Sequence, residues 1–218
     1  MFVPHQYREP DASWMADLVR RNPLALMMSD GGPGEAPLAT HLPVIRNPGE
    51  AVADPSGEPT GLSGAVLLGH MNRANPHWAA LRTGTPVRLA FTGPHAYVSP
   101  TVYDITPAAP TWNFTSVHLR GSVERIDSLE ETLAVVQDTV RAFEAEFGAD
   151  WDMTESLGYF RKIAPGVGAF RVRVTAAEGM FKLSQEQRPE IRERVRESFS
   201  GRGCARHLET ADMMGRLG

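Results

Sequence analysis

Histidines are the residues best suited to chemistry in this sequence, and four of them lie in or beside segments with strand-like patterns. They are His41, His70, His95 and His118, in ATHLP, LGHMN, GPHAYVSP and SVHLRG. Histidine changes protonation state near neutral pH, so such side chains can act as general acids or bases. A hydrogen-bonded role in the core or at the surface is an equal alternative for each. A metal site is a third alternative, which lacks acidic partners and close ligand spacing in the sequence.

The segment GHMNRANPHW has the character of an anion-binding turn. Asn72, Arg73 and Asn75 lie where a predicted strand passes into a helix that begins near Pro76. Free backbone N–H groups at a helix start favour a phosphate, and an arginine adds a charged pair of donors. The alternative for Arg73 is simple solvation at the surface.

Two further segments carry groups that suit a flat or anionic ligand. In PTWNF, the indole of Trp112 stands beside the amide of Asn113, which suits a stacked heteroaromatic ring or equally a plug in the core. In FKLSQ, Lys182, Ser184 and Gln185 offer one positive charge and two neutral hydrogen-bonding groups. The alternative for FKLSQ is an exposed loop before the C-terminal helices.

Several classes of function are disfavoured. The sequence contains no GxGxxG after a strand, no GxxxxGK[ST], no HExxH and no GxSxG. Its single cysteine, Cys204, cannot form an intramolecular disulfide and fits a reducing compartment. A formal net charge of -4 over 218 residues disfavours nucleic acid as a partner. With no signal-like start and no apolar segment of bilayer length, we expect a cytoplasmic protein without membrane contact.

Most of the candidate residues lie in or near predicted strands. Few helices, most of them short, separate these strands. Strand patterns cover 24–28, 37–45, 65–71, 87–92, 112–126 and 167–175. Helices are predicted after residue 11 or 13, from residue 76, after Ser128 with Glu131 as its capping-box partner, over 154–163, and twice after residue 188. The segment 47–64, rich in Pro and Gly, is predicted to be a surface loop. Parallel strands would need a crossover helix after nearly every strand, so the pattern favours an antiparallel barrel.

Taken in order, several segments resemble the PaiB-like family of FMN-binding negative transcriptional regulators. They are FVPHQYRE, LATHLPV, LLGHMNRANPHW, FTGPHAYVSP, PTWNF followed by VHLRG, and FKLSQ, and they reach from the start of the chain to about Arg188. The resemblance implies an α+β fold, an antiparallel split β-barrel of the pyridoxamine-phosphate-oxidase type with peripheral helices. It also implies a homodimer with FMN at the subunit interface. We expect the barrel to occupy residues 1–188 and a helical extension to occupy residues 189–218.

The same resemblance assigns roles around the cofactor. It implies that Arg73 and Asn75 hold the FMN phosphate, that His70 and Asn72 line the ribityl chain, and that Thr40 and His41 border the isoalloxazine. We add the groups of PTWNF and FKLSQ to these cofactor contacts. The chain departs from the family in having Met180 and Phe181 before Lys182, and Glu186 where an asparagine is usual.

The resemblance favours an FMN-dependent oxidoreductase acting on a small molecule, with His95 and His118 as its proton donors. Haem is a second candidate ligand, since some related barrels handle it. Two alternatives stay open: a flavin- or haem-sensing regulator without turnover, and a cofactor-free enzyme that uses histidine acid-base chemistry on the same barrel. The sequence shows no helix-turn-helix with a basic recognition helix, so we expect no specific nucleic acid partner.

Overall fold

Six antiparallel strands form a closed barrel in the order β1-β2-β3-β6-β5-β4. The structure is a computed structural model, and it describes residues 1–49 and 61–217. The strands are β1 Leu24–Ser29, β2 Leu38–Arg46, β3 Val66–Asn72, β4 Pro86–Val98, β5 Thr111–Ile126 and β6 Val167–Lys182. The predicted α+β fold with an antiparallel barrel is confirmed. Most of the loop predicted over 47–64 lies outside the described residues.

The barrel interior is filled by apolar side chains that alternate along each strand. In β4, Val87, Leu89 and Phe91 are buried while Arg88 is exposed, the period of two that a half-buried strand requires. Gly69 on β3 makes room for the ring of Phe170, whose nearest atom would lie 2.7 Å from an added Cβ. The interior is therefore a packed core, and a ligand must bind at a mouth of the barrel or on its outer surface.

Six α-helices pack on the strands or on one another in the part of the chain that the structure describes. They are α1 Ala12–Arg21, α2 Pro76–Ala80, α3 Leu129–Phe147, α4 Leu157–Ile163, α5 Pro189–Ser200 and α6 Ala205–Gly215. The predicted cap of α3 is present, since the hydroxyl of Ser128 accepts a hydrogen bond from the N–H of Glu131 at 3.3 Å. The helix α3 covers a second buried cluster on the outside of the barrel, around Leu68 and Ala169. No described helix is long and apolar enough to cross a membrane.

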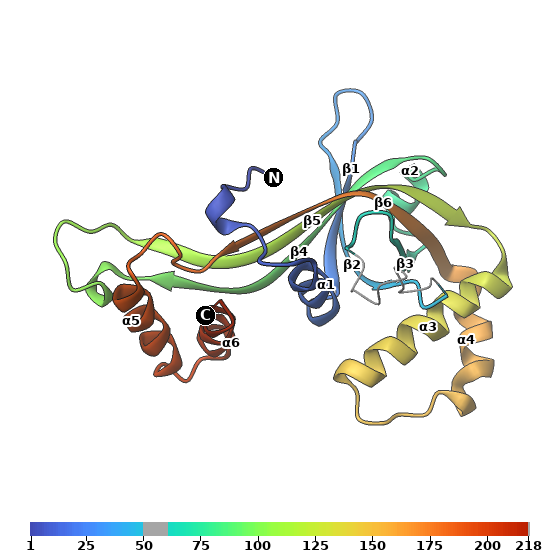
Figure 1. Cartoon of the computed structure of the whole chain (residues 1–218). Coiled ribbons are helices and arrows are strands. Elements are labelled where there is room, and N and C mark those ends of the chain that lie inside the picture. Colours follow the sequence, from blue (N-terminus) through green and yellow to red (C-terminus); the bar gives the residue numbers. More distant parts are fainter. Residues whose placement is uncertain (50–60, 218) are drawn as a thin grey trace.

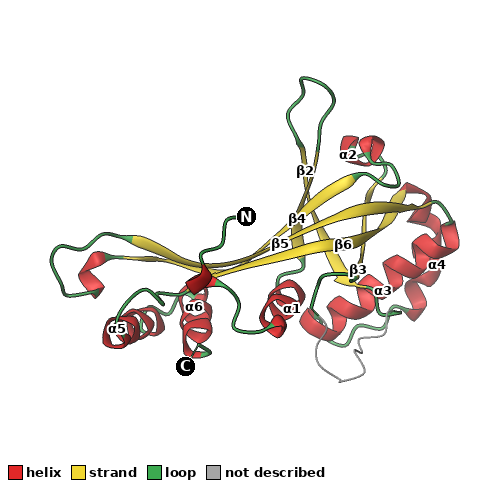
Figure 2. Ribbon diagram, turned by 45° about the horizontal axis from the view of Figure 1, so that its top comes forward, coloured by secondary structure: helices red, strands yellow, loops and turns green. Residues whose placement is uncertain are grey.

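Beyond the barrel, β4, β5 and β6 continue as a long three-stranded ribbon (Figure 1). The helices α1, α5 and α6 lie on one side of this ribbon, and the N-terminal segment lies on the other (Figures 1 and 2). The prediction that the last strand ends near Thr175 is wrong. The strand β6 continues to Lys182, because Gly179 and Phe181 are buried beneath α1 and extend the alternation.

The helices α1 and α6 meet on the helical side of the ribbon. Arg216 after α6 reaches Asp17 on α1 at 3.3 Å. Apolar side chains of α5 and α6, among them Val195, Phe199 and Met214, belong to the same buried cluster as the barrel interior. One core therefore joins the barrel to residues 189–217.

Candidate functional site

One mouth of the barrel is closed by α2, and the turn that leads into this helix is shaped by two asparagines. The side chain of Asn72 accepts a hydrogen bond from the N–H of Ala74 at 2.8 Å. Asn75 is the N-cap of α2, and its Oδ1 accepts from the N–H of His77 at 2.9 Å. Both side chains thus hold the turn that presents Arg73 to solvent.

The guanidinium of Arg73 is fixed by a hydrogen bond at Nε. Its Nε donates to the carbonyl of Val167 at 2.8 Å, and its Cζ lies 5.7 Å from the centre of the Trp78 ring. The side chain is exposed, and its terminal nitrogens have no partner among residues 1–49 and 61–217. A guanidinium fixed at Nε with free terminal donors suits bidentate binding of a phosphate or carboxylate.

His77 is a site residue that the sequence analysis missed. Its ring is buried, its Nδ1 lies 2.9 Å from Oγ1 of Thr40, and its Nε2 lies 2.9 Å from Oγ of Ser29. Burial lowers its pKa, so the ring is neutral at pH 7. Thr40 also accepts from the amide of Asn75 at 3.4 Å, which joins β1, β2 and α2 in one polar network. The sequence does offer one sign that His77 is buried. It lies next to Trp78 in a predicted helix of a single turn, and such a short helix packs on the barrel through the few side chains it has.

The outer surface of the barrel carries a row of side chains across five strands. Register pairs His41 with Leu26, Leu26 with Ala90, Ala90 with His118, and His118 with Glu178. Residues directly opposite on neighbouring strands point to the same side, so these five define what we call the open face. The N-terminal segment reaches one edge of this face, where the ammonium of Met1 bonds Glu178. His41 and His118 are three strands apart, about 14 Å at the usual strand spacing.

A second row on the open face contains two arginines that the sequence analysis also missed. Arg88 and Arg120 are register partners, and they line a shallow groove of about 540 Å³ together with Ser29 and Asp30. Like charges directly opposite each other are unfavourable unless an anion offsets them. Arg120 lies 3.6 Å from Glu178, while Arg88 has no ion pair among the described residues. This groove is a second place where an anionic group fits.

His70 lies on the outside of β3, beside the mouth. Its Nδ1 is buried and has no hydrogen-bond partner within the described chain. Burial lowers the pKa of this histidine. Since buried polar atoms are nearly always hydrogen-bonded, this nitrogen is a place where a bound group could supply the missing contact.

His95 and Trp112 lie farther along the open face, on the ribbon. A register shift between Thr92 and His95 turns His95 outward, and its Nδ1 donates to the carbonyl of Gly93 at 3.1 Å. The His95 and Trp112 rings are 6.1 Å apart, and Tyr97 meets Trp112 edge-on at 5.9 Å. The indole of Trp112 is 51% exposed, so it offers a flat surface for a ring.

Of the remaining predicted contacts, Asn113 and Ser184 point into the core and Gln185 bonds its own loop, while Lys182 is in register with Phe114 and His95 and shares their side of the ribbon. Asn113 and Ser184 are fully buried and bonded to each other at 3.0 Å, with the sulfur of Met214 3.5 Å from the Asn113 amide. The ammonium of Lys182 donates to the hydroxyl of Thr111. Gln185 bonds backbone groups of its own loop. The side chains of Asn113 and Ser184 therefore stabilise the core of this chain, where no cofactor ring can reach them.

The predicted cofactor contacts form two groups at opposite ends of β6. Arg73 bonds the first residue of this strand, Val167, and Lys182 is the last. Fifteen steps at about 3.3 Å place the two ends roughly 50 Å apart along the strand. A single mononucleotide cannot bridge that length, so one chain does not bring all predicted contacts together. The mouth residues, the orphaned nitrogen of His70 and the exposed imidazoles and indole nevertheless fit a flat, anionic cofactor.

A metal centre receives no support from the described residues, where no cluster of three or more His, Cys, Asp or Glu side chains could hold an ion. Cys204 is exposed, outside the barrel.

Comparisons with known proteins agree with this geometry. The chain is 25% identical to the protease synthase and sporulation protein PAI 2 of Bacillus subtilis over 86% of this chain and 83% of that protein. Among solved structures, it resembles the FAD and haem binding protein from Mycobacterium smegmatis, with a TM-score of 0.57 and 16% identity over 86% of this chain and 78% of that one. It also resembles the flavocytochrome Anf3 from Azotobacter vinelandii, with a TM-score of 0.53 and 14% identity over 81% and 70% of the two chains.

At such identities the structural likeness establishes the fold, which is a split barrel. The family match reaches further, because residues 1–176 match the family described as "Putative FMN-binding domain". The chain therefore belongs to this family of FMN-binding domains.

Proposed function

We propose that the protein is a homodimeric, FMN-dependent oxidoreductase acting on a small molecule. The observation that carries the proposal is Arg73, whose free guanidinium end stands at the mouth of the barrel beside the open face. Arg73 would hold the FMN phosphate, with Asn72, Asn75 and Thr40 positioning the turn. Bound FMN supplies hydride or electron transfer.

In this proposal, side chains of the protein transfer protons to and from the reacting molecule on the open face. His118 lies in the middle of this face, and His95 lies beside Trp112. Either imidazole can take up or release a proton next to a ring bound there, because each is at least partly accessible. The groove at Arg88 and Arg120 would bind an anionic part of the substrate or cofactor.

A second copy of the chain would complete the site. The outer surface carries exposed apolar side chains on β1, where Leu24 is 61% exposed, and on the ribbon, where Tyr97 of β4 is 43% exposed. Two such faces related by a twofold axis bury each other's apolar surface. In an antiparallel arrangement, the ribbon of one chain lies toward the mouth of the other. This would bring the exposed indole of Trp112 on the ribbon of one chain toward Arg73 of the other.

A flavin- or haem-sensing protein without turnover is the second candidate. It is favoured by exposed imidazoles, which can ligate haem iron, and by the structural neighbour named for binding both FAD and haem. The cofactor-free enzyme has no observation of its own in its favour.

Titration of the purified protein with FMN tests the proposal. Arg73→Ala should weaken FMN binding by about 1.5 to 3 kcal/mol, the range for a hydrogen bond to a charged group. Arg202→Ala, which removes an exposed arginine just after α5, is the matched control and should leave the affinity unchanged. Equal FMN affinity in both variants would refute the assignment of Arg73. A haem spectrum in the purified protein, with no flavin bands and no FMN binding, would favour the sensor.

A further inference from the structure

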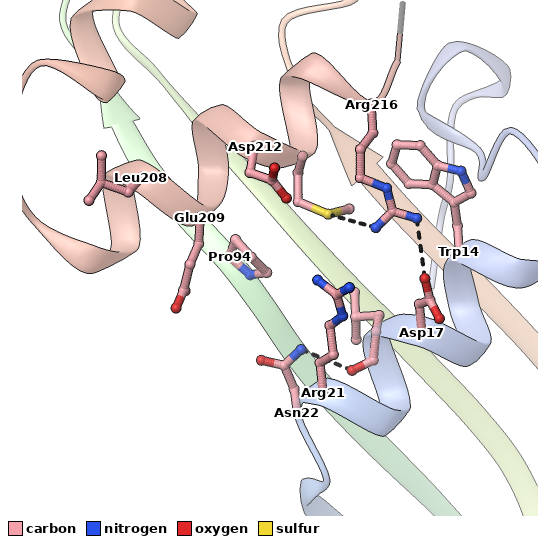
Figure 3. Close-up of a pocket in the computed structure, with 11 residues that line it drawn as sticks. Trp14, Asp17, Arg21, Asn22, Pro94, Leu208, Glu209, Asp212 and Arg216 are labelled. Atoms are coloured by element: carbon pink, nitrogen blue, oxygen red, sulfur yellow. Dashed lines mark hydrogen bonds and ion pairs between the residues drawn. The ribbon is translucent and has the colours of Figure 1, made fainter. Parts of the chain in front are cut away.

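A cavity separate from the open face lies between α1 and α6, on the helical side of the ribbon (Figure 3). Its volume is about 390 Å³, a size typical of small-molecule sites. Apolar groups form its base and walls: Pro94 from β4, Trp14 and Leu18 from α1, and Leu208 and Met213 from α6.

The base of this cavity exists because β4 is irregular at this point. The register shift between Thr92 and His95 leaves Gly93 and Pro94 without register partners on β5, and the hydroxyl of Thr115 on β5 donates to the Pro94 carbonyl at 3.2 Å. Gly93 lets α1 come close, since an added Cβ would lie 3.0 Å from a methyl carbon of Leu18. The Pro94 ring then lines the space between the two helices.

One pair of charges holds the helices together and is already satisfied. Arg216 bonds Asp17 at 3.3 Å and the sulfur of Met213 at 3.5 Å, and its Cζ lies 4.5 Å from the Trp14 ring centre. These contacts tie the end of α6 to α1. They leave the guanidinium of Arg216 little capacity for a ligand.

Three other charges on the lining have no side-chain partner in the described parts of the chain. Arg21 extends from α1 into the space, and Glu209 and Asp212 come from α6 (Figure 3). The two acids are three residues apart on one helix, so they share a face. The cavity thus has an unpaired cation on one wall, unpaired carboxylates on the other, and apolar surface between them.

We propose that this cavity binds a small zwitterion of amino-acid size with an apolar side chain. Its carboxylate would bond Arg21, its ammonium would bond Glu209 or Asp212, and its apolar part would lie on Leu18 and Pro94. The three unpaired charges sum to -1. A simple anion would be repelled by the two acids, and a simple cation would leave Arg21 unpaired. Only a ligand with both charges offsets both walls.

Such a ligand would bridge the first and last helices of the structure. Ligand that binds only the folded state adds stability by mass action, and here it would do so by closing α1 onto α6. This site uses none of the residues proposed for FMN, so either proposal can fail without the other.

Calorimetric titration of the full chain with three probes tests this assignment. They are L-phenylalanine, 3-phenylpropionate, which lacks the ammonium, and 2-phenylethylamine, which lacks the carboxylate. We expect phenylalanine to bind about tenfold more tightly than either analogue, as for one charged hydrogen bond at a partly exposed site. No binding of phenylalanine, or equal affinity for all three probes, would overturn the proposal.

Variants assign the two charges to the two walls. Arg21→Gln should weaken phenylalanine about tenfold and should not weaken 2-phenylethylamine, which has no carboxylate. The double variant Glu209→Gln with Asp212→Asn should also weaken phenylalanine about tenfold, but it should bind 3-phenylpropionate more tightly, because the repulsion from the two acids is removed. Arg206→Gln, on the same helix but outside the cavity, is the matched control. If Arg21→Gln binds phenylalanine as wild type does, or if Arg206→Gln loses as much, the assignment is wrong.

Discussion

His118 is surrounded by groups that keep its imidazole neutral. Burial, the N-terminal ammonium and Arg88 lower its pKa, and Glu178 opposes them more weakly. A neutral imidazole at pH 7 is prepared to accept a proton, so His118 is the better candidate for a base and His95 for the second proton-transfer group.

We therefore expect His118→Gln to lose turnover while it retains bound FMN, with His95→Gln affected in the same direction. In the wild type, turnover should fall as the pH drops through the pKa of His118, below the usual 6.5 or so for histidine. The residual turnover of His118→Gln should not show this decrease at acidic pH. Cys204→Ser should behave as wild type. Full turnover in both glutamine variants would assign the proton chemistry elsewhere.

Two glycines offer a paired test of packing at the closed mouth. An added Cβ at Gly168 would lie 2.4 Å from the Trp78 ring, whereas Gly158 in α4 has nothing within 4 Å. Gly168→Ala should destabilise the fold by about 1 to 3 kcal/mol through overpacking. Gly158→Ala should stabilise it by about 0.5 to 1 kcal/mol, because alanine favours a helix. Urea unfolding measures both, and equal effects would contradict the packing of Trp78 on β6.

At the scale of elements, the hydrogen bonds of His77 hold α2 on β1 and β2, and the stability they contribute depends on pH. The folded protein keeps this ring neutral, so its pKa lies below that of the unfolded chain. When the pH falls below about 6.5, the unfolded state takes up a proton that the folded state excludes, and stability decreases. Each such histidine contributes a slope of at most about 1.4 kcal/mol per pH unit.

His77→Gln should be less stable than wild type at pH 8 by about 1 to 3 kcal/mol, because Ser29 and Thr40 lose an aromatic partner. Its free energy of unfolding should then change less steeply between pH 7 and pH 5. Denaturant unfolding across this range provides the measurement. Parallel curves for variant and wild type would show that His77 is protonated equally in both states.

The sequence predicts the elements better than it predicts the site. Local signals suffice for α3, where Ser128 caps the helix, and for β5, where apolar side chains alternate. The site depends on which strands become neighbours. The pairing of β1 with β4 and of β3 with β6 creates the open face and the network at His77, and no local pattern encodes it. Strand alternation turns Asn113 away from the exposed Trp112, but its partner Ser184, 71 residues later, comes from the pairing of β5 with β6.

At the scale of the whole molecule, the open face determines the oligomeric state we propose. Trp112→Lys places a charge in the proposed interface and should convert a dimer to a monomer, because an unpaired charge there is costly to bury. Trp151→Lys is the matched control, since this indole is similarly exposed at 48% and lies near α4 instead. Light scattering reports the mass. A wild-type mass of a single chain, or a dimer that survives Trp112→Lys, would refute this interface.

The joining of α1 to α6 also sets an order on folding. Asp17 and Arg216 are 199 residues apart, and β1 cannot complete its pairing until β4 has formed. Contacts of such sequence separation form slowly, because a long loop must close before they contribute. During synthesis, α1 can pack on β6 through Trp14 and Phe181 before α6 exists, but the apolar surface of β4 and α5 on which α6 packs stays uncovered until the last helix emerges. A nascent chain halted before α6 would therefore expose this surface to chaperones and to aggregation.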